Sequence, residues 1–538
     1  MSTSKRDEIL RLTQNGRQKT ITADDAARLI GDDDVVATSG FGMLLVAEEI
    51  LQGIEKRFLD EGHPQNITLI HAAGQGDWGD GGNNHFAHKG LIKRLIAGHL
   101  GEAPKLNQMI FDNEIEAYNL PQGVISHQFR NLAGKKPGIL THVGLDTFVD
   151  PRIEGGKLND KTKEDIVKLI NFEGRELLYF TPTPIDVAIL RGTTADEKGN
   201  ITMEHEALFL EVLSMAQAAK NNGGVVIVQV ERIAEHGTLN PKAVKIPGIY
   251  VDAIVIAKKE NHRQTQDTLY SPAFSAELRV PVESVKPIAL SFKKVIGRRA
   301  AMELVPNAVL NLGIGIPAFV AAVAGEEGLI DEMDLTVEGG TIGGMPAWAH
   351  DFGASTNPDA ILDQPYQFDH YDGGGIDVTF LGLAEITNDC DINVSKFAGD
   401  IPGCGGFINI SQGAKIVVFC GAFTAAGLRI EIVDGQLKII KEGKIKKFKK
   451  SIMHKTFSGA YSQKIKQRVV IVTERAVFGV NENGIILEEI APGIDLEKDI
   501  LANMEFVPQI SKNLKMMDAR IFKDAPMNLC ELIRDNTV

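Results

Sequence analysis

The sequence predicts an α/β protein made of two similar open domains with mainly parallel sheets, and three observations lead to this prediction. A chain of 538 residues is too long for one typical core, so two or more domains are expected. Short apolar runs alternate along it with amphipathic helical stretches. Three segments of the first half also return in the same order in the second half.

The apolar runs are the predicted strands. Their near-continuous hydrophobicity is typical of strands covered on both faces, as in parallel sheets. In chain order they are "DDVVATSG", "NITLIHAAG", "GGVVIVQVE", "NAVLNLG", "DLTVEGG" and "AKIVVFCGA". Farther along, Asp434-Gly435 and Asn483-Gly484 each separate two alternating apolar runs, which predicts two hairpins.

The returning segments indicate an internal duplication. "RLIGDDDVVATSGFG" resembles "ELVPNAVLNLGIG", since both predict a helix end, a strand and a Gly-x-Gly turn. "IDVAILRGTTADEKGNI" parallels "IDVTFLGLAEITNDCDINV", and "NNGGVVIVQV" parallels "SQGAKIVVFC". The alternative is chance similarity, because strands of αβ units share a restricted alphabet.

The domain boundary is expected within residues 276–294, where two prolines interrupt the pattern. The helix "VIGRRAAMELV" then opens the second half. We therefore predict an N-terminal domain over residues 1–285 and a C-terminal domain over residues 286–538.

Composition restricts the classes of partner. The formal net charge of -14 and pI near 5.5 argue against nucleic acid, which requires a concentrated positive surface. The six lysines of Lys441 to Lys450 form either a solvated basic edge or a contact for an anionic ligand or a subunit. No apolar run is long enough to span a bilayer, so no membrane partner is expected.

The remaining compositional signals favour a cytoplasmic enzyme without a metal. The N-terminus has no apolar signal core, and the four cysteines lack C-x-x-C spacing, so reduced thiols are expected. The densest histidine group is His71, His85 and His88, for which loop contacts are favoured over metal ligation. G-x-S-x-G, phosphate-loop and H-E-x-x-H motifs do not occur.

One carboxylate stands out by its neighbours. Glu338 ends the predicted strand "DLTVE" and is followed by glycines at 339, 340, 343 and 344. Because glycines have no side chain to shield the carboxylate, this setting favours chemistry at Glu338 itself. The matching strand of the first half, "ITLIHAAG", has His71 and no carboxylate, so the duplicated scaffold alone does not account for the acid.

The glycines around this strand leave several functions open. Gly313-x-Gly315-x-x-Ala318, with Pro317 near the start of the next helix, matches a dinucleotide fingerprint. Glu338 lies twenty residues beyond Ala318, where an NAD-dependent oxidoreductase places its ribose-binding acid. A tight turn that needs glycine explains the same motif. A non-catalytic sensor of CoA or a nucleotide is a further alternative.

A second glycine cluster, Gly403, Gly405 and Gly406 in "IPGCGGFINIS", precedes another apolar strand. Its backbone N–H groups could stabilise an oxyanion. An ordinary loop is the competing interpretation.

Several motifs together resemble the family I coenzyme A transferases. "NLGIGIP", "TVEGGTIGG", "GGGIDVTFLGLAEI" and "GCGGFINIS" occur in the family's order and at similar separations. "YNLPQGV", "GLDTFVDPR", "GGKLND", "IVTERAVF" and "EIAPGIDLEKDIL" extend the likeness over the whole chain. Within the family, the motifs are most similar to the bacterial acetate or propionate type, which acts on short-chain acyl-CoA, acetate and 3-ketoacids.

The resemblance implies roles for particular residues. The family's nucleophilic glutamate falls on Glu338. CoA binding and the oxyanion site fall on Gly313, Ile314, Gly315, Ile316 and Pro317, and on Gly403, Gly405 and Gly406. Weaker implied contacts to the acyl group or oxyanion involve Gly40, Phe41, Gly42 and Gln122, although "SGFGM" departs from the G-x-G-G-F form of some members.

The resemblance also implies the reaction. CoA would pass from a short-chain acyl-CoA to a free acid, such as acetate, propionate, butyrate or acetoacetate, through a γ-glutamyl-CoA thioester on Glu338. CoA and acyl-CoA would be substrates, with no permanently bound cofactor. A homotetramer or another homo-oligomer is expected, with a place in short-chain fatty acid or ketone body metabolism.

Overall fold

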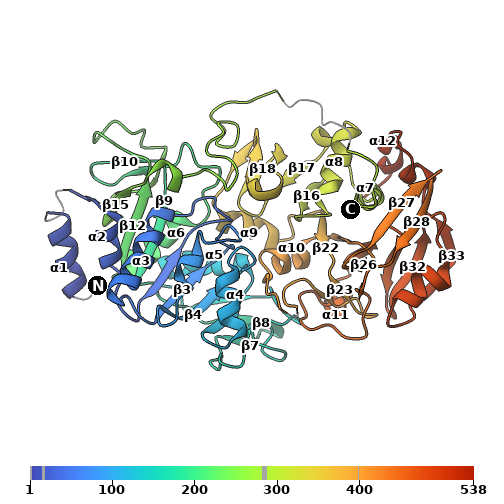
Figure 1. The fold of residues 1–538 in the computed structure, drawn as a ribbon, viewed down its shortest axis with the longest axis horizontal. Helices are drawn as coiled ribbons and strands as arrows, with labels where there is room; N and C mark the ends of the chain where they lie inside the picture. Colours follow the sequence, from blue (N-terminus) through green and yellow to red (C-terminus); the bar gives the residue numbers. More distant parts are fainter. Residues whose placement is uncertain (1–2, 15–17, 282–287, 398) are drawn as a thin grey trace.

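The computed structural model describes residues 3–14, 18–281, 288–397 and 399–538. Figure 1 shows the N-terminal half, blue to green, beside the C-terminal half, yellow to red, along the longest axis. The predicted boundary between residues 285 and 286 lies outside the described residues. The division into 1–285 and 286–538 therefore stays a prediction.

The N-terminal half is built on a sheet of eight strands, all of whose pairings are parallel. The central strands are buried along their whole length, which explains why they are apolar without alternation. In spatial order the strands are β1 (Thr20–Ile21), β15 (Ala253–Ile256), β12 (Val225–Val230), β9 (Val187–Arg191), β2 (Val35–Thr38), β3 (Ile67–His71), β4 (Ile92–Ala97) and β5 (Glu116–Asn119).

The C-terminal half is built on a sheet of ten strands with a parallel centre and antiparallel additions on both sides, and its last strand pairs parallel with its neighbour. In spatial order these are β21 (Ala360–Ile361), β18 (Thr341–Ile342), β17 (Asp334–Thr336), β16 (Val309–Leu312), β22 (Val378–Gly382), β25 (Ile416–Cys420), β30 (Arg468–Val472), β31 (Ala476–Asn481), β32 (Gly484–Ile490) and β33 (Gln509–Met516).

The strand orders confirm the predicted duplication. The five central strands run β15-β12-β9-β2-β3 in the first sheet and β30-β25-β22-β16-β17 in the second. Each of the matched sequence segments falls on an equivalent pair: β2 with β16, β9 with β22, and β12 with β25. Strand β17, which leads to Glu338, is thus the counterpart of β3, which ends at His71.

Helices cover the sheets and close four apolar clusters. Two of them lie mainly in the first half but include a few residues of the second half, and the other two lie within the second half. In the first half they are α1 (Thr3–Leu12), α2 (Ala23–Arg28), α3 (Glu48–Glu61), α4 (Pro104–Phe111), α5 (Gln122–Ala133) and α6 (Val212–Asn221). In the second half they are α7 (Phe292–Ala301), α8 (Ala318–Glu326), α9 (Gln364–Asp372), α10 (Phe407–Gly413), α11 (Gly459–Lys464) and α12 (Leu529–Ile533).

Small sheets complete the fold, and both predicted hairpins form. β27 (Arg429–Val433) turns into β28 (Gln436–Lys441) through Asp434 and Gly435, whose φ values of 52° and 74° fit the twist of a tight hairpin. β31 turns into β32 through Glu482 and Asn483, and Gly484 is the first residue of β32 and pairs with Asn481. The other short strands are β6 (Ile139–Thr141), β7 (Val167–Phe172), β8 (Arg175–Phe180), β10 (Thr194–Asp196), β11 (Ile201–Thr202), β13 (Arg232–Ala234), β14 (Val244–Ile246), β19 (Met345–Pro346), β20 (Ser355–Thr356), β23 (Glu385–Ile386), β24 (Ile392–Asn393), β26 (Thr424–Ala425) and β29 (Ile445–Lys446).

The lysine-rich run 441–450 is only partly a solvated edge. Lys446 Nζ donates to Ala502 O at 2.8 Å, and Lys447 Nζ donates to Leu383 O at 2.8 Å. Lys449 pairs with Glu385. These three lysines fasten the segment to neighbouring loops, while Lys441, Lys444 and Lys450 are exposed. Among the described helices, none has the length and apolarity to cross a membrane.

Candidate functional site

The two halves meet at a cavity of about 270 Å³, which we call the inner pocket. Its walls come from the carboxyl ends of parallel strands in both halves, where α/β proteins characteristically bind ligands. Phe41 and Gly42 follow β2, and Gly313 and Ile314 follow the equivalent strand β16. Glu338 follows β17. The duplication thus explains why segments so far apart in the sequence line one pocket.

Glu338 occupies the inner pocket with its carboxylate unpartnered. No described residue donates a hydrogen bond to that carboxylate, and part of the residue's surface stays accessible. Burial raises the pKa of Glu338 to about 7, with nearby His99 acting in the opposite direction and Glu102 adding to the rise. A carboxyl group that is desolvated and free of donors is well suited to react as a nucleophile.

Gly406 lies directly against this carboxyl group. A Cβ atom placed on Gly406 would come within 3.4 Å of Glu338 Cδ and within 3.2 Å of Ile410 Cδ1. A Cβ at position 406 would therefore crowd Ile410 and Phe368 and would be in van der Waals contact with the carboxyl group of Glu338. Gly406 of the second glycine cluster thus lies next to Glu338.

The backbone N–H groups of this cluster are less available than expected. The N–H of Gly403 donates to Ser395 O at 3.0 Å, and the N–H of Gly405 donates to Gly98 O at 2.7 Å. Both glycines line the inner pocket, but their donors are already used. Within the described chain, the Gly406 N–H has no acceptor.

Gln122 provides a second unused donor. This residue starts α5, lines the inner pocket and is 1% exposed. Its side-chain Nε2 has no hydrogen-bond partner among the described residues, while its backbone N–H is held by Gly405 O at 2.9 Å. A buried amide without an acceptor is costly unless a ligand supplies one.

An outer pocket of about 560 Å³ adjoins the inner one and shares Phe41, Gly42, Glu102, Gly313, Ile314 and Phe352 with it. It extends along the turn between β16 and α8, where Gly315 and Ile316 line it. Two aromatic side chains on its wall, Trp78 and Trp348, are 49% and 47% exposed. Such exposed apolar surface beside a cavity is characteristic of a binding site.

Two predicted site residues lie outside both pockets. Pro317 precedes the first residue of α8 and shapes the turn, but it contributes to neither wall. Gly40 is buried behind Phe41, and a Cβ there would meet Val46 and Gln75 at 2.8 Å and 2.9 Å. Gly40 and Pro317 therefore shape their loops and do not line the pockets in which a ligand would bind.

His99 and Glu102 are pocket residues that sequence reasoning missed. Both follow β4, and His99 Nδ1 lies 2.8 Å from Glu102 Oε2. Burial disfavours the imidazolium, yet Glu102 and Glu338 outweigh this effect and raise the pKa of His99. Burial likewise opposes the charge of Glu102, but His99 holds the pKa of Glu102 below its usual value.

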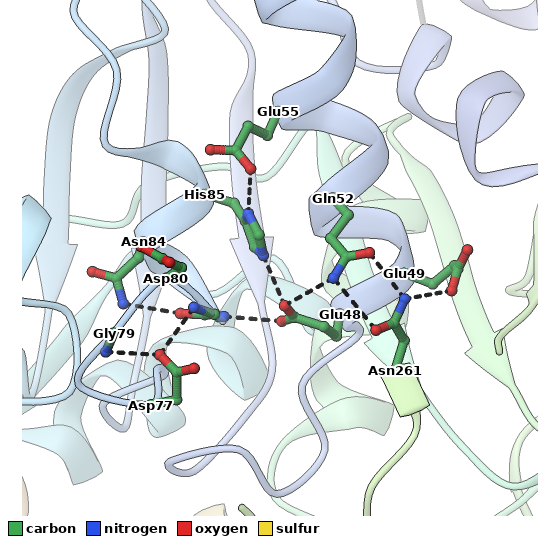
Figure 2. A network of polar contacts seen from close by, with 12 residues as sticks. Glu48, Glu49, Gln52, Glu55, Asp77, Gly79, Asp80, Asn84, His85 and Asn261 are labelled. Carbon is green, nitrogen blue, oxygen red and sulfur yellow. Dashed lines mark hydrogen bonds and ion pairs between the residues drawn. The ribbon is translucent and has the colours of Figure 1, made fainter. Parts of the chain in front are cut away.

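A polar network, drawn in Figure 2, fixes the loop on either side of Trp78, which lines the outer pocket. Glu48 of α3 accepts hydrogen bonds from the Gly82 N–H at 2.9 Å and from His85 Nε2 at 2.7 Å. His85 also contacts Glu55 at 2.5 Å through Nδ1. Asp77 accepts from two further backbone N–H groups of the loop.

The predicted loop contacts of the histidine group are thus found for His85. His88 likewise contacts Glu55, at 2.6 Å, and His71 Nδ1 contacts Ala73 O at 2.7 Å. Within the described part of the chain, no three His, Cys, Asp or Glu side chains are grouped to hold a metal ion.

The dinucleotide interpretation and the CoA interpretation predict the same local geometry. Gly315 lies between β16 and α8, and Glu338 follows the neighbouring parallel strand, as either function requires. Geometry alone therefore does not decide between them, and similarity to known proteins does.

Comparison with known proteins identifies the family. The Coenzyme A transferase family model matches residues 20–257. The caffeate CoA-transferase of Acetobacterium woodii is 47% identical, with 94% of this chain and 98% of that protein covered. The acetate CoA-transferase YdiF of Escherichia coli K12 is 42% identical over 95% of this chain and 97% of its own length.

Solved structures agree with these sequence matches. The acyl-CoA transferase YdiF of Escherichia coli O157:H7, as the apoenzyme and in a thioester complex with CoA, superposes with a TM-score of 0.91 at 41% identity. The match covers 96% of this chain and 98% of the YdiF chain. The chain belongs to the coenzyme A transferase family and is a CoA-transferase.

Proposed function

We propose that this enzyme moves CoA from a short-chain acyl-CoA to a free carboxylic acid through a thioester on Glu338. The observation that supports this most strongly is the position of Glu338, a partly buried carboxylate without hydrogen-bond donors among the described residues, where both halves close one pocket. The thioester complex with CoA of the similar YdiF supports a covalent route of this kind.

Each nucleophile of the exchange attacks in its anionic form. The Glu338 carboxylate attacks the acyl-CoA carbonyl, the C–S bond breaks, and a mixed anhydride and CoA thiolate result. The thiolate attacks the glutamyl carbonyl, releasing the first acid and leaving γ-glutamyl-CoA. A second acid then reverses these steps and leaves as the new acyl-CoA. The net charge stays constant throughout.

Each attack creates an oxyanion that needs hydrogen-bond donors. Gln122 Nε2 and the Gly406 N–H are two donors of the inner pocket that have no acceptor among the described residues. We assign the oxyanion contacts to them rather than to Gly403 and Gly405, whose N–H groups are bonded within the protein. In comparable sites, losing one such donor raises the barrier by about 3 to 4 kcal/mol.

CoA is proposed to enter through the outer pocket, along Gly313 to Ile316. The exposed rings of Trp78 and Trp348 offer apolar surface to the arm of CoA, and Lys293 on the same wall can meet a phosphate. CoA and acyl-CoA are substrates in this scheme, and no permanently bound cofactor takes part. Binding energy from contacts far from the reacting carbon can then lower the barrier of the reaction at Glu338.

The proposed acids are acetate, propionate, butyrate and acetoacetate. An acetate CoA-transferase at 42% identity supports the short-chain class. A caffeate CoA-transferase at 47% identity, together with Phe41, Phe352 and Phe407 on the pocket wall, favours an aromatic acid as the second candidate. We further propose a cytoplasmic homotetramer or other homo-oligomer that serves short-chain fatty acid or ketone body metabolism.

The substrate class is tested by acyl exchange in the full-length enzyme. Acetyl-CoA is offered with each acid at equal concentration, and the new acyl-CoA is measured by chromatography, with Glu338→Ala as the control. Exchange with propionate and butyrate that exceeds exchange with caffeate supports the short-chain class. Preferential formation of caffeoyl-CoA would replace it with the aromatic class.

A further inference from the structure

We propose that His99, held by Glu102, binds the carboxylate of the free acid that attacks the glutamyl-CoA thioester. This inference rests on the function proposed above and adds the group that recognises the acceptor. His99 and Glu102 share the inner pocket wall with Glu338. The mechanism described so far uses neither of them.

The position of the His99 ring is fixed from several sides. Nδ1 lies 2.8 Å from Glu102 Oε2, and the side chains of His99 and Glu102 are only 24% and 13% exposed. A Cβ on Gly74 would collide with the Glu102 carboxylate and come within 2.8 Å of His99 Nδ1, so glycine is required for this pair. The His99 backbone also bridges to Gly403 of the other half.

The second ring nitrogen is unused. Because Nδ1 donates to Glu102, the imidazolium has one N–H left, on Nε2, and no described residue accepts from it. A carboxylate oxygen is the natural acceptor for such a donor, since charge-assisted hydrogen bonds are about twice as strong as neutral ones.

The surrounding negative charges favour the protonated form of His99. The titratable groups that act on His99 are Glu102, Glu338 and Asp400, which favour its protonation, while burial opposes it. His71 lies behind the pair, and burial lowers its pKa to about 4, so it is neutral at physiological pH. The pocket therefore favours a cation at His99 beside the reacting carboxylate.

The charge of Glu338 changes during the proposed cycle, and this change gives His99 its role. In the resting enzyme the imidazolium attracts the Glu338 carboxylate and lowers its pKa. When Glu338 becomes a thioester it is neutral, so the cation loses that counter-charge. An acceptor acid is an anion and restores it, whereas the acyl group of acyl-CoA is neutral. His99 should thus matter for the acid far more than for acyl-CoA.

Steady-state kinetics of His99→Gln, with acetyl-CoA and propionate as probes, test this role. We expect the KM for propionate to rise about 10- to 100-fold, as expected for a lost charge-assisted hydrogen bond. The KM for acetyl-CoA and the yield of CoA-modified Glu338 should stay within about threefold of the wild type. His63→Gln is the matched control, because His63 forms an exposed pair with Asp32 at 2.9 Å.

Glu102→Gln provides a second, independent variant. Without the Glu102 carboxylate the imidazolium should deprotonate at lower pH, so the KM for propionate should begin to rise at a lower pH than in the wild type. An unchanged KM for propionate in both variants, with normal modification of Glu338, would overturn the role of His99 alone. A wild-type enzyme that forms no CoA adduct on Glu338 would instead overturn the proposed function.

Discussion

Replacing Glu338 by glutamine should stabilise the protein while abolishing its activity. Burial moves the pKa of this carboxyl group from its ordinary 4.5 to about 7. The ionised side chain therefore costs the folded state on the order of 3 kcal/mol. Glutamine has nearly the same shape and no charge, so the variant avoids this cost.

The pH window of the effect follows from the same shift. The folded protein holds the Glu338 proton more tightly than the unfolded chain does. The stabilisation of the folded state by this bound proton is therefore fully present below pH 4.5 and is lost as the pH rises through about 7. Glu338→Gln should match the wild type near pH 4.5 and exceed its melting temperature by several degrees at pH 8.

Thermal unfolding at several pH values measures this difference. Glu332→Gln serves as the control, because Glu332 is exposed in the same half and its replacement removes no buried charge. If Glu338→Gln and the wild type had the same melting temperature at pH 8, the carboxylate would not be desolvated in the folded enzyme. The inference that Glu338 is a nucleophile because its carboxylate is desolvated would then be refuted.

Two further substitutions probe the inner pocket. Gln122→Ala removes an unused amide donor, so kcat should fall about 10²- to 10³-fold with little change in the KM for acyl-CoA. A normal kcat would show that Gln122 does not contribute to the oxyanion site. Gly406→Ala places a Cβ 3.4 Å from Glu338 Cδ, and stopped-flow formation of the thioester should slow about 10-fold or more. Gly134→Ala, whose Cβ would make only ordinary contacts with Asn131 O at 3.7 Å and the Lys136 side chain at 3.9 Å, should leave that rate unchanged. Equal rates in both glycine variants would contradict the role of the Gly406 contact.

Sequence reasoning predicted the scaffold because the scaffold depends on local patterns. Strands buried on both faces are apolar throughout, and the repeated segments marked equivalent strands of two sheets. Glu338 was identifiable for the same reason, since a glycine-flanked acid ends a strand whose counterpart ends with His71. The hairpin at Asp434-Gly435 likewise followed from turn chemistry.

Features that depend on three-dimensional assembly were not predictable in this way. His99 and Glu102 sit in "AGHLGEAP", which has no motif, and only the parallel order of β3 and β4 brings them beside a residue of the other half. The N–H groups of Gly403 and Gly405 look available in the sequence, but Ser395 O accepts from the first and Gly98 O, from the other half, accepts from the second.

The covalent role of Glu338 is tested most directly by mass spectrometry. The wild-type enzyme is incubated with acetyl-CoA and no acceptor acid, digested, and searched for CoA attached to the peptide that contains Glu338. We expect the adduct in the wild type, its disappearance on addition of acetate, and its absence in Glu338→Gln. No adduct in the wild type, together with full acyl exchange by Glu338→Ala, would contradict the proposed mechanism.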